Sequence, residues 1–136
     1  MVWGESVDGL RQNTNGTRKR VLIADDSQSS LDLLRFILER SGCDVIEAQD
    51  GKQALILALQ YNPDLFILDL NMPQLDGYGV AAELRKQAAF MQTPILALSA
   101  GITATDSARI TQAGFSAFLS KPIPPAALRK CISELL

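Results

Sequence analysis

The sequence predicts an α/β fold, a doubly wound, five-stranded parallel sheet with helices on both faces. Two observations carry this prediction. A short apolar run, a polar break and an amphipathic stretch recur in that order five times. The runs are continuously apolar rather than alternating, which is typical of parallel strands covered on both faces. These runs are VLIA (21–24), CDVIEA (43–48), LFILDL (65–70), PILALS (94–99) and FSAFLS (115–120).

Two of the runs carry further information. CDVIEA is the most polar of the five, which favours a place at the edge of the sheet. LFILDL is apolar except for Asp69, whose carboxylate therefore needs a cationic partner from elsewhere. A piece of a larger α/β barrel is the alternative architecture, but it requires more strand–helix units than this chain supplies.

Caps and stop signals predict the five intervening helices. The first is expected over 27–41, because Leu31, Leu34 and Leu38 share one face. In the second helix, Asp50 with Gln53 indicates the start and Tyr61–Pro63 the end. Asp76 would cap the third helix, and Thr103 or Thr105 would cap the fourth, which should end near Gly114. Pro124–Pro125 suits the first turn of the fifth helix.

The composition indicates one globular domain. The 136 residues are 47% hydrophobic and 21% charged, which is ordinary for a folded domain and argues against general disorder. No apolar stretch approaches the ~20 residues needed to span a bilayer, and no signal region begins the chain. We therefore expect a cytoplasmic location without membrane contact by this segment. Cys43 and Cys131 lack metal-site spacing, so we expect two buried free thiols.

Charge and residue usage exclude several functions. Residues 1–18 are polar and rich in Gly, Asn and Thr, which predicts a flexible leader or linker before a folded domain over 19–136. The first 20 residues carry a net charge of +2 and the remainder −4, without a basic stripe, which argues against direct nucleic-acid binding. The chain has no histidine, which excludes Ser-His-Asp, Cys-His and histidine–zinc chemistry.

Polar and charged side chains gather where the predicted strands end. Asp25 and Asp26 follow the first strand, Asp69 ends the third, Ser99 ends the fourth and Lys121 follows the fifth. The carboxyl ends of parallel strands share one edge of the sheet, so these residues should lie together. Each alone has an ordinary explanation as a helix cap, a turn residue or an exposed lysine. Their joint placement indicates a site.

Three carboxylates in one crevice repel each other, so either one of them is protonated or a cation binds there. Oxygen ligands without His or Cys favour Mg²⁺. A magnesium ion beside Lys121 would also attract a phosphoryl group, and Asp69 could be the nucleophile that forms an acyl phosphate. In this interpretation Lys121 pairs with one phosphoryl oxygen and Ser99 donates a hydrogen bond to another.

The motifs LIADDS, ILDLNMPQLDGYG, LALSA and FLSKPI resemble the receiver domain of two-component response regulators over residues 19–136. The resemblance implies a (βα)5 flavodoxin-like fold and a phosphorylatable regulatory domain rather than an enzyme. It implies that Asp69 receives a phosphoryl group from a phosphohistidine on a histidine kinase or histidine phosphotransfer protein. Asp26 and Asp69 would bind Mg²⁺, helped by Asp25 through water and by the backbone carbonyl of Asn71.

The resemblance also implies a switch. Ser99 would move toward the phosphoryl group, and Phe118 would follow into the space released. Phe118 could also be a plain core-packing residue, and both roles can hold at once. The remodelled surface would comprise the fourth helix, the fifth strand and the fifth helix, and the Lys121–Pro122 bond would be cis.

Two other activities and two settings are weighed. A Mg²⁺-dependent phosphohydrolase with an aspartyl-phosphate intermediate would need a second carboxylate two residues after Asp69, where Asn71 stands. A flavin-binding electron-transfer domain would have a phosphate loop that the Asp25–Asp26 pair repels. For a receiver, both a stand-alone protein and the receiver of a hybrid sensor kinase stay open, as do the kinase, the downstream target and the oligomeric state.

Overall fold

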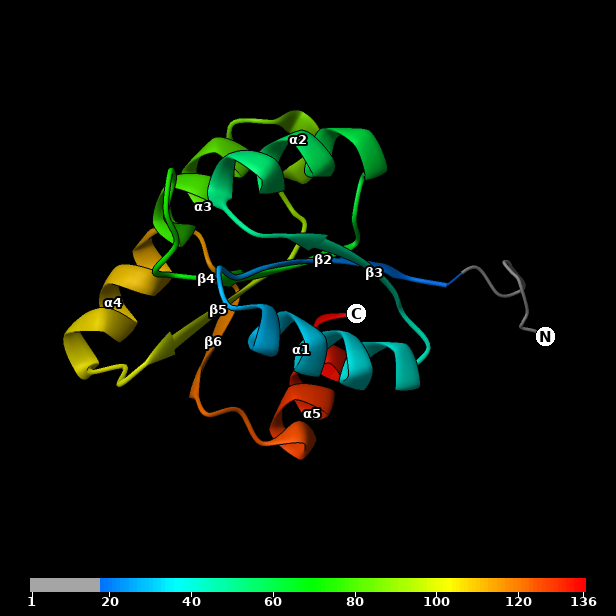
Figure 1. The fold of residues 1–136 in the computed structure, drawn as a ribbon. Helices are drawn as coiled ribbons and strands as arrows, with labels where there is room; N and C mark the ends of the chain where they lie inside the picture. The colour runs from blue at the N-terminus through cyan, green and yellow to red at the C-terminus, as the bar shows by residue number, and fades with distance from the viewer. Residues whose placement is uncertain (1–17) are drawn as a thin grey trace.

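The computed structural model describes residues 18–136, so the leader predicted at 1–18 lies outside the described residues except for Arg18. The predicted fold is confirmed, because five parallel strands form one sheet between two layers of helices (Figure 1). The elements in chain order are β2 (Arg20–Ala24), α1 (Gln28–Arg40), β3 (Asp44–Ala48), α2 (Gly51–Tyr61), β4 (Leu65–Asp69), α3 (Gly77–Arg85), the short 3₁₀ helix η1 (Ala88–Phe90), β5 (Ile95–Ala100), α4 (Ala104–Gln112), β6 (Ala117–Lys121) and α5 (Pro125–Leu135).

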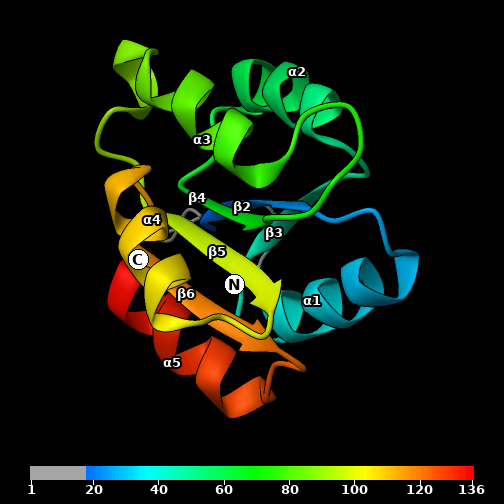
Figure 2. The same ribbon diagram turned by 90° about the vertical axis from the view of Figure 1, so that its left-hand side faces the viewer.

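The sheet has the strand order β3-β2-β4-β5-β6, so the polar run at 43–48 does form an edge strand, as predicted. One core cluster joins the sheet to α1 and α5, and the other joins it to α2, α3 and α4 (Figure 2). Side chains of β2 alternate between them: Val21 and Ile23 face α1, whereas Leu22 and Ala24 face α2. Both faces of the sheet are therefore buried, which explains the continuous apolar runs.

The predicted helix starts are confirmed, and one alternative is resolved. Ser27, Asp50 and Asp76 cap α1, α2 and α3 by accepting backbone N–H groups of the first turn. Thr103, not Thr105, caps α4. Its hydroxyl accepts from the N–H of Asp106 while the Asp106 carboxylate accepts from the N–H of Thr103, a reciprocal capping box.

The fifth strand begins later than predicted, at Ala117 rather than at 115. Phe115 belongs to the core under α4, where its ring meets Tyr78 edge to face at 5.9 Å between centroids. Ser116 ends this connection, because its N–H donates to the carbonyl of Ile95 and its hydroxyl accepts from the N–H of Ile95. The apolar run at 115–120 therefore combines a core anchor with a strand, which hydrophobicity alone does not separate.

Cys43 and Cys131 are free and buried, as predicted. Burial raises the pKa of the Cys43 thiol to about 11, so this thiol stays protonated at neutral pH. Within residues 18–136 no helix has the length and apolar character needed to cross a membrane.

Candidate functional site

The predicted site residues lie at one edge of the sheet. β2, β4, β5 and β6 contribute Asp25, Asp69, Ser99 and Lys121 from their carboxyl ends, and the pairs β2–β4, β4–β5 and β5–β6 are hydrogen-bonded neighbours. The parallel register thus gathers residues that are up to 96 positions apart in the sequence. This edge is the usual position for sites in open α/β sheets.

Three carboxylates form a cluster at this edge. Each of Asp25, Asp26 and Asp69 offers an oxygen, and these oxygens lie within 4.8 Å of one another. Asp25 and Asp69 are buried, whereas Asp26 is exposed. The cluster therefore has two buried carboxylates and one carboxylate that faces solvent. Its oxygen-only chemistry fits a hard divalent cation such as Mg²⁺.

Lys121 bridges the two buried carboxylates. Its Nζ donates to Asp25 Oδ2 at 2.8 Å and to Asp69 Oδ2 at 3.2 Å. Burial alone would lower the pKa of Lys121, but the hydrogen bonds and charges of Asp25 and Asp69 outweigh it and raise the pKa. Lys121 is thus a cationic partner for the Asp69 carboxylate in the folded protein. The Asp25 carboxylate pairs with the same ammonium.

Backbone N–H groups hold the remaining carboxylate oxygens. The N–H of Ser27 donates to Asp25 Oδ1 at 2.9 Å, and the N–H of Asn71 donates to Asp69 Oδ1 at 3.0 Å. Both carboxylates are thereby fixed by one backbone group and one ammonium. The orientation of Asp69 is set before any ligand arrives.

Burial is the main reason why the pKa of Asp69 is raised. The Asn71 N–H lowers the pKa, the nearby Asp25 carboxylate raises it, and Lys121 lowers it, with an upward shift as the net result. The folded protein therefore binds a proton at Asp69 more strongly than the unfolded chain does. Linkage then requires the free energy of unfolding to fall as pH rises from the ordinary carboxyl range toward the raised pKa.

Replacing Asp69 with asparagine is expected to raise the free energy of unfolding at neutral pH by about 1 kcal/mol when divalent cations are absent. The substitution removes the unfavourable buried charge and keeps an oxygen for the Asn71 N–H. The gain should vanish below a pH of about 4, where the unfolded chain is also protonated. Urea unfolding in EDTA at neutral and acidic pH measures this difference.

Asp32→Asn is the control, because Asp32 is exposed on α1 and accepts a hydrogen bond from Gln28, its one side-chain partner among residues 18–136. Its free energy of unfolding should stay near that of the wild type at both pH values. An Asp69→Asn protein that is less stable than wild type at neutral pH would contradict the electrostatic argument.

Gly77 allows α3 to start directly against the Asp69 backbone. A Cβ at this position would lie 2.6 Å from the carbonyl oxygen of Asp69, closer than any side chain tolerates. The N–H of Gly77 also donates to the carbonyl of Leu70 at 3.2 Å. The Asp-Gly pair in the motif therefore positions the segment that follows Asp69, which the sequence alone did not explain.

Ser99 and Phe118 lie on neighbouring strands. Ser99 is half-buried, and its hydroxyl donates to the carbonyl of Ala100 at 3.4 Å. Phe118 is 38% exposed on β6, so the interpretation of this residue as plain core packing is wrong for this conformation. The Lys121–Pro122 peptide bond is cis, as the family resemblance implied.

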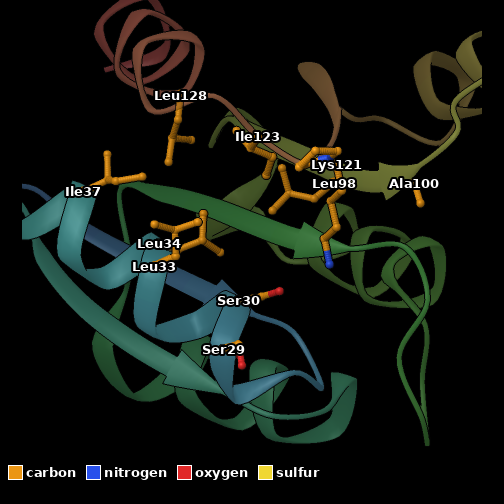
Figure 3. A pocket seen from close by; sticks show the side chains of 11 residues that line it. Ser29, Ser30, Leu33, Leu34, Ile37, Leu98, Ala100, Lys121, Ile123 and Leu128 are labelled. Carbon is orange, nitrogen blue, oxygen red and sulfur yellow. The ribbon is translucent and has the colours of Figure 1, made fainter.

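An apolar groove of about 510 Å³ opens beside Lys121, and no motif in the sequence predicts it. Figure 3 shows α1 on one side of the groove, with Leu33, Leu34 and Ile37, and the β6–α5 connection and α5 on the other, with Ile123 and Leu128. Leu98 and Lys121 lie between these walls. The groove thus runs from the face of α1 to Lys121, the lysine that pairs with Asp25 and Asp69.

Comparison with known proteins gives a family and a fold. The family model described as "Response regulator receiver domain" matches residues 21–133 of this chain. The chain is 38% identical over 118 residues to PhoP, the alkaline phosphatase synthesis transcriptional regulatory protein of Bacillus subtilis, covering 87% of this chain and 48% of PhoP. It therefore spans about half the length of PhoP. It is also 34% identical over 105 residues to the polar-differentiation response regulator DivK of Brucella ovis, covering 77% of this chain and 85% of DivK.

Two solved structures are close to this fold. The chemotaxis protein CheY4 of Vibrio cholerae superposes with a TM-score of 0.85 at 31% identity, covering 88% of this chain and 100% of CheY4. The receiver domain of the sensor histidine kinase PA1611 of Pseudomonas aeruginosa, solved with magnesium in its active-site cleft, has a TM-score of 0.81 at 28% identity, with 88% and 98% covered. This chain therefore belongs to the family of response regulator receiver domains, the phosphoacceptor domains of two-component signalling.

Proposed function

We propose that this domain is a Mg²⁺-dependent switch in which Asp69 accepts a phosphoryl group from a phosphohistidine. Receiver domains take phosphoryl groups from histidine kinases or phosphotransfer proteins. The observation that supports Asp69 most is its buried carboxylate, held by the Asn71 N–H and by the Lys121 ammonium. These 136 residues contain no histidine, so the phosphohistidine must lie outside them, on another domain or on another protein.

Mg²⁺ would be held by Asp26, Asp69 and the backbone carbonyl of Asn71, with Asp25 acting through water. Charge balance supports this proposal, because the cluster holds three carboxylates and Lys121, which pairs with two of them, brings one positive charge. Magnesium bound in the PA1611 receiver domain supports it by relationship. The ion would neutralise negative charge as the phosphoryl group approaches the carboxylate.

The transfer itself requires little from this chain beyond position and charge. An Asp69 oxygen attacks phosphorus, the P–N bond to the partner's imidazole breaks, and the imidazole nitrogen keeps the bonding electron pair. The product is an acyl phosphate on Asp69. Lys121 then pairs with one phosphoryl oxygen, and the Ser99 hydroxyl donates to another.

A partner helix that carries the histidine would dock on α1. The groove supports this placement, because its lining joins apolar residues of α1 to Lys121, which pairs with Asp69. Leu33 and Phe36 add exposed apolar surface on the same helix. An amphipathic helix laid along such a groove is a common mode of recognition.

Phosphorylation would change the surface formed by α4, β6 and α5. Ser99 moves toward the phosphoryl group in this proposal, and the exposed Phe118 ring turns inward behind it. Two conformations that differ by a few kcal/mol suffice, because one charge-assisted hydrogen bond and a repacked ring are enough to shift the population. The cytoplasmic location and the place of the domain in a stand-alone or hybrid protein stay predictions.

Phosphorylation by a small donor tests this proposal. Phosphoramidate also carries a P–N bond, so with Mg²⁺ it should add one phosphoryl group per chain, which hydroxylamine removes from an acyl phosphate. Asp69→Asn or added EDTA should abolish the mass increase, while Asp32→Asn should retain it. Intact-protein mass spectrometry measures all four cases.

Labelling that persists in Asp69→Asn would overturn the assignment of Asp69. Full labelling in EDTA would overturn the role of the metal. Sustained turnover of small phosphate esters that depends on Asp69 would favour the phosphohydrolase alternative instead.

A further inference from the structure

The loop that follows Asp69 contains a turn with an uncommon backbone conformation. The N–H of Leu75 donates to the carbonyl of Pro73 at 2.8 Å, which makes a three-residue γ-turn with Gln74 at its centre. Gln74 has a positive φ of 70°, a value that a glutamine rarely adopts. Such a turn persists only where its surroundings hold it in place, so the contacts of Leu75 are informative.

The first residue of α2 packs directly against the backbone of this turn. Gly51 is buried, and a Cβ at this position would overlap the carbonyl oxygen of Leu75 and lie 2.7 Å from its carbonyl carbon. Only a residue without a side chain allows the helix and the turn to come this close. Gly51 therefore fixes the distance between the start of α2 and the Leu75 carbonyl group.

Gly79 on α3 faces the same leucine, but it meets the side chain instead of the backbone. A Cβ at Gly79 would overlap Leu75 Cδ1 and lie 3.0 Å from Leu75 Cγ. The end of a leucine side chain can change its rotamer, whereas a backbone carbonyl moves only with its chain. Of these two glycines, Gly51 is thus the one that restrains the backbone of the turn.

The restrained turn is linked to the Asp69 carboxylate by a short packed segment. Asn71 lies four residues before Leu75, and its N–H donates to Asp69 Oδ1 at 3.0 Å. Met72 lies between them and is buried in the same core cluster against which Leu75 packs. Because this segment is packed, a displacement of the Leu75 backbone should be transmitted to the Asn71 N–H.

The start of α2 is tied to the other buried carboxylate of the cluster. The N–H of Asp25 donates to the carbonyl of Ala48 at 3.2 Å, at the end of β3. Gly51 begins α2 three residues after Ala48. The contact between Gly51 and Leu75 therefore joins the two segments that are hydrogen-bonded to the buried aspartates.

We propose that Gly51 is a positioning residue, which acts through Leu75 and Asn71 on the carboxylate of Asp69. Its lack of a side chain lets the turn lie where the Asn71 N–H orients Asp69. The Asn71 carbonyl, a Mg²⁺ ligand in the proposed function, depends on the same loop, and this part of the inference rests on that proposed function. Groups that orient metal ligands typically change metal affinity by about 10- to 100-fold.

Gly51→Ala should raise the dissociation constant for Mg²⁺ about tenfold, measured by isothermal titration calorimetry of the full chain. In EDTA, the Asn71 amide proton should move upfield in a ¹H–¹⁵N correlation spectrum, because its hydrogen bond to Asp69 lengthens. Gly79→Ala is the matched control. It also places an alanine in the first turn of a helix against Leu75, but it should leave both readouts unchanged, because the leucine side chain can move aside.

Thermal unfolding in EDTA shows whether each variant is folded. If Gly51→Ala does not fold, Leu75→Ala takes its place in both measurements. This variant removes the side chain that packs the same turn into the core, so it should raise the Mg²⁺ dissociation constant at least about threefold and move the Asn71 amide proton upfield.

Two results would overturn the role of Gly51 and leave the proposed function intact. One is a folded Gly51→Ala protein with the Mg²⁺ affinity and the Asn71 amide shift of the wild type. The other is an equal loss of affinity in Gly51→Ala and Gly79→Ala, which would place the effect on the leucine side chain. A wild-type chain that binds no Mg²⁺ would instead overturn the proposed metal, and the Asn71 amide shift would then decide the role of Gly51.

Discussion

Replacing Lys121 with methionine is expected to lower the free energy of unfolding by about 2–4 kcal/mol in the absence of divalent cations. The ammonium is the common partner of Asp25 and Asp69, which are both buried. Methionine keeps most of the side-chain volume but leaves these two carboxylates facing each other without a cation. Lys121 is itself 26% exposed, so water compensates in part and the loss should lie toward the lower end of this range.

Magnesium should reduce the difference between the Lys121→Met protein and the wild type. A divalent cation supplies positive charge to the same carboxylates, so the variant has more to gain from it than the wild type has. Low pH should reduce the difference as well, because protonated carboxyl groups no longer need the ammonium. Urea unfolding with EDTA, with Mg²⁺ and at acidic pH measures these three differences.

Lys86→Met provides the matched control for Lys121. Lys86 also forms an ion pair, with Glu83 at 3.0 Å, but both side chains are exposed. Exposed pairs contribute little, so this variant should stay within about 0.5 kcal/mol of the wild type. An equal loss from both lysines, or a Lys121→Met deficit that Mg²⁺ leaves unchanged, would show that the buried carboxylates do not depend on that ammonium.

The location of the site follows from the sequence because its residues are at strand ends. The sequence places Asp25, Asp69, Ser99 and Lys121 after successive apolar runs, and a parallel sheet brings such positions to one edge. The sequence does not specify which carboxylates form ion pairs with Lys121. The double contact of Lys121 with Asp25 and Asp69 depends on side-chain directions that only the folded register fixes.

Features that depend on packing between distant elements escaped prediction. The groove beside Lys121 exists because α1 and α5 stand on the same face of the sheet, and no local pattern encodes its width. The apolar run predicts a fifth strand that begins at residue 115, but the strand begins at Ala117. Phe115 is apolar because it packs against Tyr78, not because it belongs to the strand. The apolar side chain of Phe118, within an apolar run, suggests a core residue. Its place on the edge strand β6 nevertheless leaves it exposed.

Arg85 is another residue whose role is visible only in the fold. Its guanidinium donates to three backbone carbonyls, those of Phe90 at 2.6 Å, Thr93 at 2.7 Å and Gly114 at 2.7 and 3.2 Å. These contacts join the end of α3 to the segment before β5 and to the loop between α4 and β6. Over residues 18–136 no carboxylate pairs with Arg85, and burial lowers the pKa of this arginine.

Arg85→Met is therefore expected to lower the free energy of unfolding by about 3–5 kcal/mol, because three partly buried carbonyls lose a charged donor. Arg85→Lys should lose roughly half as much, since an ammonium reaches some of these carbonyls but lacks the planar fork that serves all of them. Arg109→Met is the comparison. Its guanidinium lies 3.9 Å above the Tyr78 ring, a contact worth about 1 kcal/mol.

The ranking of these three variants separates hydrogen bonding from packing as the source of the stability. If the aliphatic part of Arg85 were what mattered, methionine would preserve stability better than lysine does. If the donors matter, lysine is the milder substitution and hydrogen exchange accelerates first at Gly114 and Phe115, where the loop is released. Urea unfolding decides the first point and amide exchange the second. A loss below about 1 kcal/mol for Arg85→Met would mean that water replaces the guanidinium at these carbonyls.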